Sequence, residues 1–384
     1  RDAVLANGTL VHGLDFDDTH SASVLHATAS ALPTVLGVSE HEGSDGAALL
    51  AAYLVAIETD ARIGAAGRGQ FQVRGFHPTG LIGAFGATLA AGRLQGLTAA
   101  ELEHAQGIVL SMASGNLEFL EDGAWTKRMH PGWAGVAAVT ACALAKAGFQ
   151  GPGKPYEGRY GLYRTHLGPD TLVDLERCTA GLGSTWEMLN VAIKPYPVCH
   201  FIHAFADAAL ALRREHGLAP DDIESVTAHI HPDQVQVVCE PEAAKRVPQS
   251  DYEGKFSLPY VVASSLVNDR FTLDELEDAA LRDPATLELA KRVTWEGDDR
   301  SLFPAYYSGA ITIRTRDGRE LTQREAHNRG SDANPLSEDD ILGKFHANAA
   351  RAVPRERAEA IAAAVMALET SPDTSDLAAA LAAG

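Results

Sequence analysis

The sequence predicts a mainly helical protein with a smaller α+β domain inserted between its N-terminal and C-terminal parts. From Asp2 to about Gln150 the chain is rich in Ala, Leu and Gly at helical spacing, and β-branched alternation is scarce. After about residue 190 some segments alternate with a period of two, which is typical of half-buried strands. An Ala-rich helical pattern returns after Ser337. We therefore expect a helical domain at 1–185, an α+β domain at 190–335 and C-terminal helices at 336–384 that return to the helical domain.

The N-terminal part is expected to form a stack of helices. Ser21 to Val38 reads as a helix kinked by Pro33, and a third helix with a long apolar run is expected from Gly46 to Gly64. Phe76-His-Pro-Thr-Gly80 then opens a helix rich in Gly and Ala. Such small residues indicate close contact between helices.

Two further helices are expected before residue 150. Thr98 and Glu101 have the spacing of a capping box, so a helix should run from there towards Met112. The stretch from Glu118 to Gly132 reads as a loop with a turn signal and a pair of cations, and a helix resumes from Trp133 to Lys146. Loops between helices carry function more often than cores do.

Strands are expected only after the Gly- and Pro-containing connection from Gly151 to Gly183. The segment Ile223–Ile230 alternates with period two, like a strand with one buried face. Ala310–Arg316 and Arg319–Thr322, separated by Asp-Gly, read as a β-hairpin.

Helices are expected to flank these strands. We predict them from His200 to Arg214 and from Leu258 to Leu266, with Thr272 capping another. Ser337 is expected to cap a final helical region that extends through Met366.

Length and charge limit the classes of function. With 384 residues, 46% of them hydrophobic, the chain can form two domains with a sizeable core. Its formal net charge of −19 argues against nucleic acid or an anionic membrane as a partner, because both would repel it. A small anionic ligand would need a local cationic pocket, so Lys and Arg residues near apolar segments become candidates.

The cysteines are scattered and contain no CxxC pair, so neither a zinc site nor a disulfide framework is expected: they are Cys142, Cys178, Cys199 and Cys239. A reducing cytoplasm is the simplest location. No apolar run reaches the ~18–20 residues that a membrane-spanning helix needs.

The stretch from His12 to His20, together with His26, is the first candidate for chemistry. Taken as a helix, it puts Asp15 and Asp18 on one face where a buried apolar stripe should continue. Buried carboxylates need hydrogen bonds or cations, and such surroundings shift their pKa values into a range useful for proton transfer. The alternative is that these Asp residues cap the next helix or face solvent.

Several other ionisable groups lie in apolar or Gly-rich surroundings. In the loop, Lys127 can hold a substrate carboxylate as a point charge, or it can form a solvated pair with Arg128. His200 and His203 lie one turn apart, but no further ligand follows at the usual spacing, so we expect no metal. His203 is either a satisfied core residue or a general base. Tyr260 is either an aromatic anchor or a phenol donor, and Arg74 and His77 are analogous candidates.

Familiar cofactor and nucleophile motifs are missing. The sequence has no Walker phosphate loop, no GxGxxG at a strand-to-helix turn and no GxSxG nucleophile elbow. The dispersed Asp, His, Lys and Tyr groups suit the abstraction of a proton next to a carboxylate without a cofactor.

Five stretches in order resemble the MmgE/PrpD family, which includes 2-methylcitrate dehydratase, cis-aconitate decarboxylase and iminodisuccinate epimerase. They are His12-Gly-Leu-Asp-Phe-Asp-Asp-Thr19, Gly75-Phe-His-Pro-Thr-Gly80 with Gly83-Ala-Phe-Gly86, Asp122-Gly-Ala-Trp-Thr-Lys-Arg-Met-His-Pro-Gly-Trp133, Lys194-Pro-Tyr-Pro-Val-Cys-His200 and Lys255-Phe-Ser-Leu-Pro-Tyr260. The resemblance implies a large helical domain from both chain ends, an inserted α+β domain, an active site in the cleft between them, a homodimer and no required cofactor.

The resemblance also implies site residues. By motif, the catalytic positions of decarboxylase members fall on Asp15, His26, Lys127, His203 and Tyr260. His20 competes with His26, and His200 competes with His203. The remaining substrate-binding candidates are Arg74, His77, Arg128, His20, Lys194 and His200. Thr-Lys-Arg-Met-His lacks the Pro that follows Lys in decarboxylase-like loops, which counts against a cis-aconitate decarboxylase.

These expectations combine into a hypothetical mechanism. Lys127, helped by Arg74 or Arg128, would bind substrate carboxylates. His203 or His26 would move the proton at carbon, Asp15 would orient the imidazole, and Tyr260 would donate to a leaving hydroxyl or an enolate oxygen. We therefore expect a lyase acting on a di- or tricarboxylate, like 2-methylcitrate dehydratase. The alternatives are an epimerase on the same substrates and a non-catalytic helical binding protein.

Overall fold

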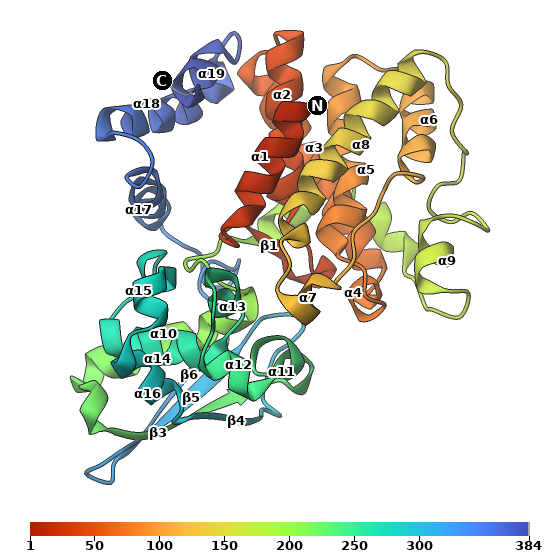
Figure 1. The fold of residues 1–384 in the computed structure, drawn as a ribbon. Helices are drawn as coiled ribbons and strands as arrows, with labels where there is room; N and C mark the ends of the chain where they lie inside the picture. The colour runs from red at the N-terminus through yellow and green to blue at the C-terminus, as the bar shows by residue number, and fades with distance from the viewer. Residues whose placement is uncertain (383–384) are drawn as a thin grey trace. The chain divides into compact units, whose positions relative to one another are not determined.

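The computed structural model describes residues 1–382, and the chain divides into two compact units. Unit 1 comprises 1–13, 17–191 and the segment that begins at Ser337, and unit 2 comprises 14–16 and 192–336. Unit 1 is helical, whereas unit 2 combines helices with a four-stranded sheet (Figure 1). The predicted fold class, mainly helical with a smaller α+β part, is confirmed. Residues 383–384 of the expected C-terminal segment lie outside the described residues.

Most of unit 1 is α-helix. Its helices are α1 (Asp2–Gly13), α2 (Ala27–Glu42), α3 (Gly46–Ala66), α4 (Gln70–Val73), α5 (Pro78–Leu94), α6 (Ala99–Val109), α7 (Phe119–Asp122), α8 (Thr126–Lys146), α9 (Leu162–Leu167), α17 (Glu338–Ala349), α18 (Arg355–Met366) and α19 (Ser375–Leu381). The short strands β1 (Thr19–His20) and β2 (Val191–Ala192) form a two-stranded sheet. None of the helices among residues 1–382 has the length and apolar character needed to cross a bilayer.

Helix α5 is buried along almost its whole length between α3 and α8, and its glycines explain how. A Cβ added at Gly86 would overlap the Ala56 carbonyl oxygen of α3. A Cβ added at Gly80 would lie 2.8 Å from Cβ of His130 on α8. The expected close helix contact is therefore confirmed, and it brings the start of α5 next to His130.

Several helix starts differ from the sequence-based predictions. The Thr98 capping box at α6 is confirmed: the Thr98 hydroxyl accepts from the Glu101 amide, and the Glu101 carboxylate accepts from the Thr98 amide. Helix α2, however, begins at Ala27 rather than Ser21, because Ser21–Ser23 form a 3₁₀ turn and Val24 adopts a left-handed φ of 54°.

Two of the differences change the interpretation of candidate site residues. Helix α1 ends at Gly13 and Asp15 has a left-handed φ of 53°, so the predicted helical face shared by Asp15 and Asp18 is wrong. Helix α8 already begins at Thr126, so Lys127 and Arg128 lie in its first turn and not in a loop.

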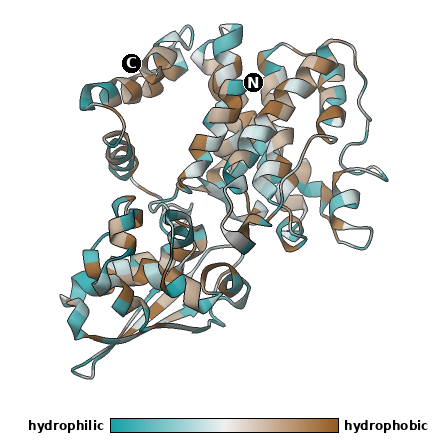
Figure 2. Cartoon of the chain, in the orientation of Figure 1, coloured by the Kyte–Doolittle hydropathy of each residue, from teal (hydrophilic) through white to brown (hydrophobic). Residues whose placement is uncertain are grey.

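The C-terminal segment, blue in Figure 1, packs against the start of α3. The Gly46 amide donates to the Ser371 carbonyl at 3.0 Å, and a Cβ at Gly46 would overlap the Leu368 carbonyl oxygen. Figure 2 shows hydrophobic and hydrophilic residues mixed along α18 and α19. Few residues of these helices are buried, among them Ala358 and Leu377.

Unit 2 is built on one sheet with strand order β4-β3-β5-β6. Strand β3 (Ile223–Ile230) pairs in parallel with β4 (Val293–Gly297) and antiparallel with β5 (Gly309–Thr315), which pairs antiparallel with β6 (Glu320–Glu325). The predicted strand and hairpin are confirmed, whereas β4 was not predicted.

Helices of unit 2 pack on this sheet. Helix α10 contacts β5 and β6, and α14 contacts β4. The helices are α10 (His203–His216), α11 (Pro232–Val238), α12 (Glu242–Arg246), α13 (Asp251–Lys255), α14 (Leu258–Asn268), α15 (Asp278–Leu281) and α16 (Pro284–Ala290). Their apolar side chains and those of the strands form one core.

Candidate functional site

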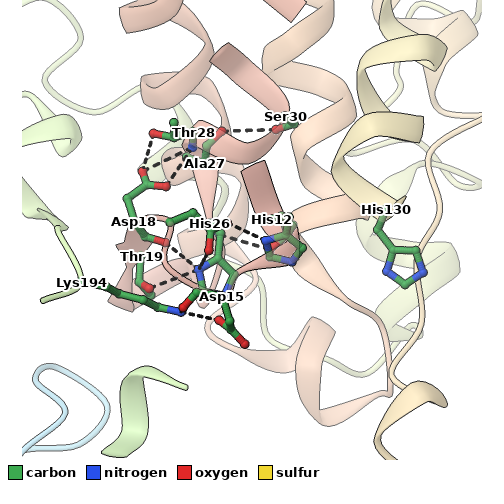
Figure 3. Close-up of polar contacts among 12 residues, drawn as sticks. His12, Asp15, Asp18, Thr19, His26, Ala27, Thr28, Ser30, His130 and Lys194 are labelled. Carbon is green, nitrogen blue, oxygen red and sulfur yellow. Dashed lines mark hydrogen bonds and ion pairs between the residues drawn. The ribbon is translucent and has the colours of Figure 1, made fainter. Parts of the chain in front are cut away.

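Four imidazole rings and one ammonium group gather in unit 1, and we call this group the histidine cluster: His12, His26, His77, His130 and Lys127. The ring centroid of His12 lies 5.2 Å from that of His26 and 5.5 Å from that of His77. The centroids of His77 and His130 are 5.1 Å apart. Three of these rings are seen in Figure 3. The cluster residues come from the end of α1, the starts of α2 and α5, and the first two turns of α8.

Asp17 supplies a carboxylate to this cluster. Its Oδ2 lies 2.5 Å from Nδ1 of His12, and its Oδ1 lies 3.8 Å from Nδ1 of His26. Both His12 and Asp17 are buried. Among the residues that the structure describes, Nε2 of His12 is buried and makes no hydrogen bond. Such a group is expected where a ligand is bound or chemistry is done.

The contacts of His26 fix its tautomer. Its Nδ1 lies 2.6 Å from the Asp18 carbonyl oxygen and 3.2 Å from the Thr19 hydroxyl. Because a carbonyl only accepts, Nδ1 must carry the hydrogen, and Nε2 then holds the lone pair of the neutral ring. The His26 amide donates to the Thr79 hydroxyl at 3.1 Å, which ties the start of α2 to α5.

The carboxylate of Asp18 accepts hydrogen bonds from the first turn of α2. It accepts the Thr28 amide at 3.1 Å and the Thr28 hydroxyl at 2.8 Å (Figure 3). Burial, and secondly the neighbouring Asp17 charge, raise the pKa of Asp18 to about 7. The alternative that an Asp in this stretch caps the next helix is therefore confirmed for Asp18.

The imidazoles on α5 and α8 are held neutral at pH 7. Burial, followed by the charges of His12 and Lys127, lowers the pKa of His77 well below its ordinary value. The same causes lower the pKa of His130 to about 4. The positive charge of Lys127 beside these neutral rings makes the histidine cluster suited to binding a carboxylate.

Asp15 and Lys194 form a buried ion pair in unit 2. Lys194 is fully buried, and its Nζ donates to the Asp15 carboxylate at 2.5 Å and to the Asp15 carbonyl at 3.0 Å (Figure 3). Each of these buried charges depends on the other, because removing one would leave the other buried without a counter-charge. The pair holds Asp15 in its left-handed conformation.

His200 and His203 are also buried in unit 2, with ring centroids 4.5 Å apart. Nε2 of His203 lies 3.1 Å from the Val198 carbonyl and therefore donates to it. Nε2 of His200 lies 2.9 Å from the Asn328 amide nitrogen. The two residues are thus neighbours, as their spacing predicts.

Tyr260 lies in the hydrophobic core of unit 2. Its hydroxyl donates to the Glu275 carbonyl at 2.5 Å, and burial raises its pKa. These contacts are those of the aromatic anchor that the sequence allowed as one of two roles.

The remaining predicted residues have varied surroundings. His20 bonds the Ser23 hydroxyl at 2.7 Å and Glu187 at 3.1 Å. Arg128 lies over the Trp125 ring at 4.7 Å from the centroid, and Arg74 is exposed at the end of α4.

The structure therefore brings seven of the predicted residues together in one group of three and two pairs. His26, His77 and Lys127 meet in unit 1, and four others lie in two pairs in unit 2: Asp15 with Lys194, and His200 with His203. Within residues 1–382, no group of three or more His, Cys, Asp or Glu side chains is arranged to hold a metal ion.

Sequence reasoning missed His12, Asp17 and His130 as members of the site. A signal was present for each. His12 and Asp17 belong to the same motif as Asp15, and His130 follows Lys127 by three residues, which is the spacing of one helix face.

Comparisons with known proteins cover nearly the whole chain. Residues 1–173 match the MmgE/PrpD N-terminal domain, and residues 196–370 match the MmgE/PrpD C-terminal domain. Cis-aconitate decarboxylase of Mus musculus is 30% identical over 98% of this chain and 77% of its own length. The Homo sapiens enzyme is 28% identical, with 98% and 78% covered, and that of Aspergillus terreus is 27% identical, with 98% and 80% covered.

Proposed function

The chain belongs to the MmgE/PrpD family, and from this we propose that it is a lyase acting on a small tricarboxylate. The observation that best supports the proposal is the histidine cluster, which brings four imidazole rings and the ammonium group of Lys127 together. The cluster offers positive charge for carboxylates and neutral nitrogen bases for a proton on carbon.

We assign the roles as follows. Lys127 binds a substrate carboxylate as a point charge. His26 is one candidate for the group that moves the proton at carbon, because its Nδ1 is held by the Asp18 carbonyl and its Nε2 then carries the lone pair. Asp17 orients His12 and lies near His26, a role that the sequence had suggested for Asp15. His203 remains the second candidate for the proton step.

The first candidate reaction is the loss of water from a substrate like 2-methylcitrate. A general base takes the proton next to a carboxylate, and a general acid protonates the departing hydroxyl. The same residues need no metal in this scheme. We expect activity to survive exhaustive treatment with a chelator, and a loss that added Mg²⁺ or Fe²⁺ restores would contradict this part of the proposal.

Loss of CO₂ from cis-aconitate is a second candidate, which the names of the three relatives favour. The Thr-Lys-Arg-Met-His sequence around Lys127 counts against it. Epimerisation would use the same carbanion and return the proton on its other face.

A two-step experiment separates these outcomes. Citrate, cis-aconitate, 2-methylcitrate and aspartate-like acids are first screened by thermal shift, since a ligand at 100 times its Kd adds about 2.7 kcal/mol of stability. Each binder is then followed by proton NMR in D₂O. Loss of water or CO₂ supports the lyase, whereas deuterium exchange without either product supports an epimerase. If none of these acids binds, the proposal fails and the alternative of a non-catalytic binding protein is favoured.

A further inference from the structure

Two histidines of unit 1, His77 and His130, form a hydrogen bond between their Nδ1 atoms. Nδ1 of His77 lies 2.9 Å from Nδ1 of His130, and both side chains are buried. An imidazole nitrogen donates when it carries hydrogen and accepts when it does not. The contact therefore holds one proton, with one ring donating and the other accepting.

The surrounding helices hold both rings in place. His77 stands at the N-terminus of α5, where its amide donates to the Gly115 carbonyl at 3.1 Å, and His130 lies in the second turn of α8. Gly80 allows these helices to approach at this point. Both rings meet Phe119 edge to face, with centroid distances of 5.8 Å and 6.1 Å.

One proton in this contact makes the two rings complementary. The ring that donates from Nδ1 keeps a lone pair at Nε2, so it can act as a base. The ring that accepts at Nδ1 carries hydrogen at Nε2, so it can act as an acid. A second proton placed within the contact would break it, because both Nδ1 atoms would then carry hydrogen, whereas a proton taken up at Nε2 of the donating ring leaves the contact intact.

The charged groups around the contact oppose a second proton as well. His12 on α1, His26 at the start of α2 and Lys127 on α8 act on His77, and His12 and Lys127 act on His130. All of them are cationic or can become so, and the carboxylate of Asp17 is engaged by His12.

We propose that His77 and His130 form a proton relay for the lyase reaction, in which one ring acts as the general base, the other acts as the general acid, and each sets the tautomer of its neighbour. This inference rests on the proposed function. In the dehydration, the base Nε2 takes the proton from carbon while the C–O bond breaks, and the shared proton crosses from one Nδ1 to the other. The second ring then gives its Nε2 proton to the departing hydroxyl, which leaves as water. The rings end neutral with exchanged tautomers, and proton exchange with water restores them.

The first test needs no substrate. In the ¹⁵N NMR spectrum of the wild-type protein at pH 7, one of the two rings should show the Nδ1–H tautomer and the other the Nε2–H tautomer. The rings are assigned by comparison with His77→Asn and His130→Asn. Two rings of the same tautomer, or a doubly protonated ring, would overturn the relay even if the protein proved to be a tricarboxylate lyase.

The second test uses turnover. His130→Asn can still bond Nδ1 of His77 but cannot pass a proton, so kcat should fall about 10²–10⁴-fold while KM changes less than about threefold. His130→Gln is the fallback if the Asn variant does not fold. The exposed His41 supplies the matched control, since His41→Asn should leave both constants unchanged. A wild-type kcat in a folded His130→Asn would refute the relay, whereas inactivity of the wild type on every tricarboxylate would refute the proposed function alone.

Discussion

Lys127 is a buried ammonium group in α8 whose charge acts on two imidazoles, His77 and His130. We propose that this ammonium group binds a substrate carboxylate as a point charge. Hydrogen bonds to charged groups are worth about 1.5–3 kcal/mol, and 1.36 kcal/mol corresponds to a factor of ten. We therefore expect Lys127→Ala to raise KM for the tricarboxylate about 10- to 100-fold, with a smaller change in kcat.

Steady-state kinetics of purified variants would measure this effect. Lys146→Ala, at the exposed end of the same helix, removes an equal charge and should change neither constant. An unchanged KM in Lys127→Ala would show that Lys127 does not bind the substrate.

Asp18 is expected to make stability depend on pH. Its pKa is raised from 3.8 to about 7 in the folded protein. The folded state thus favours the protonated acid. The free energy of unfolding that the protonated group contributes is lost as the pH rises from about 4 through 7, because ionising Asp18 is less favourable in the folded than in the unfolded protein. Asp18→Asn, which cannot ionise, should be more stable than the wild type at pH 8, and the difference should shrink as the pH falls to 4.

Melting temperatures from circular dichroism between pH 4 and pH 8 would reveal the trend. Asp170→Asn at an exposed position serves as the control and should parallel the wild type. A difference between Asp18→Asn and wild type that does not vary with pH would show that Asp18 is ionised in the fold at all these values.

At the residue scale, the sequence predicted part of the site. His26, His77 and Lys127 could be named because each stands in a recognisable motif. The meeting of His77 with His130 could not, since it depends on how closely α5 approaches α8 at Gly80. The hydrophobic periodicity of a single helix does not predict how closely that helix approaches another.

Helix α5 owes its position to glycines, and Gly86 offers a test at the scale of elements. Its amide donates to the buried Asp60 carboxylate at 2.8 Å, and a Cβ would overlap that carboxylate and the Ala56 carbonyl. Forcing extra atoms into a packed core costs about 1–3 kcal/mol. Gly86→Ala should therefore lower the free energy of unfolding by this amount.

Denaturant titration would quantify the loss. The control is Arg93→Ala on the exposed side of the same helix, and surface changes of this kind usually stay within about 0.5 kcal/mol. Equal stability of Gly86→Ala and the wild type would mean that α3 and α5 can separate without cost.

Elements with local signals were predicted well. Thr98 begins a helix because its hydroxyl and Glu101 form a capping box, and the alternation in 223–230 gives β3. Strand β4 lacks such a signal, because most of its residues are exposed or half-buried and its partner β3 is separated from it in the sequence by the helices α11 to α16. The start of α8 was placed too late, because Gly123 and Pro131 both read as helix breakers.

On the scale of the whole molecule, unit 1 draws on both the N-terminal and the C-terminal part of the chain. The contact of Gly46 with Leu368 and Ser371 joins them. Gly46→Ala should push the C-terminal segment from α3, because the new Cβ would overlap the Leu368 carbonyl. We expect faster amide exchange in α18 and α19, with little change in α5 and α8.

Hydrogen–deuterium exchange with mass spectrometry would locate the change. Ala47→Ser, at the exposed neighbouring position, keeps the backbone contact and should exchange like the wild type. Unaltered exchange in Gly46→Ala would show that the segment is held by other contacts.

The return of the chain to unit 1 was expected from the Ala-rich pattern after Ser337, but its docking place was not. Composition and periodicity predict that a helix has an apolar side. They do not say which of the earlier helices that side will meet, because the partner lies hundreds of residues away.

The bond between Gly46 and Ser371 also sets an order of events during synthesis. A ribosome completes α3 long before it reaches Ser371, and at about 5–20 residues per second the delay is on the order of tens of seconds. Throughout that time the nascent helical unit carries an uncovered patch at the start of α3. The stretch around Ser371 that covers this patch is synthesised about 300 residues later.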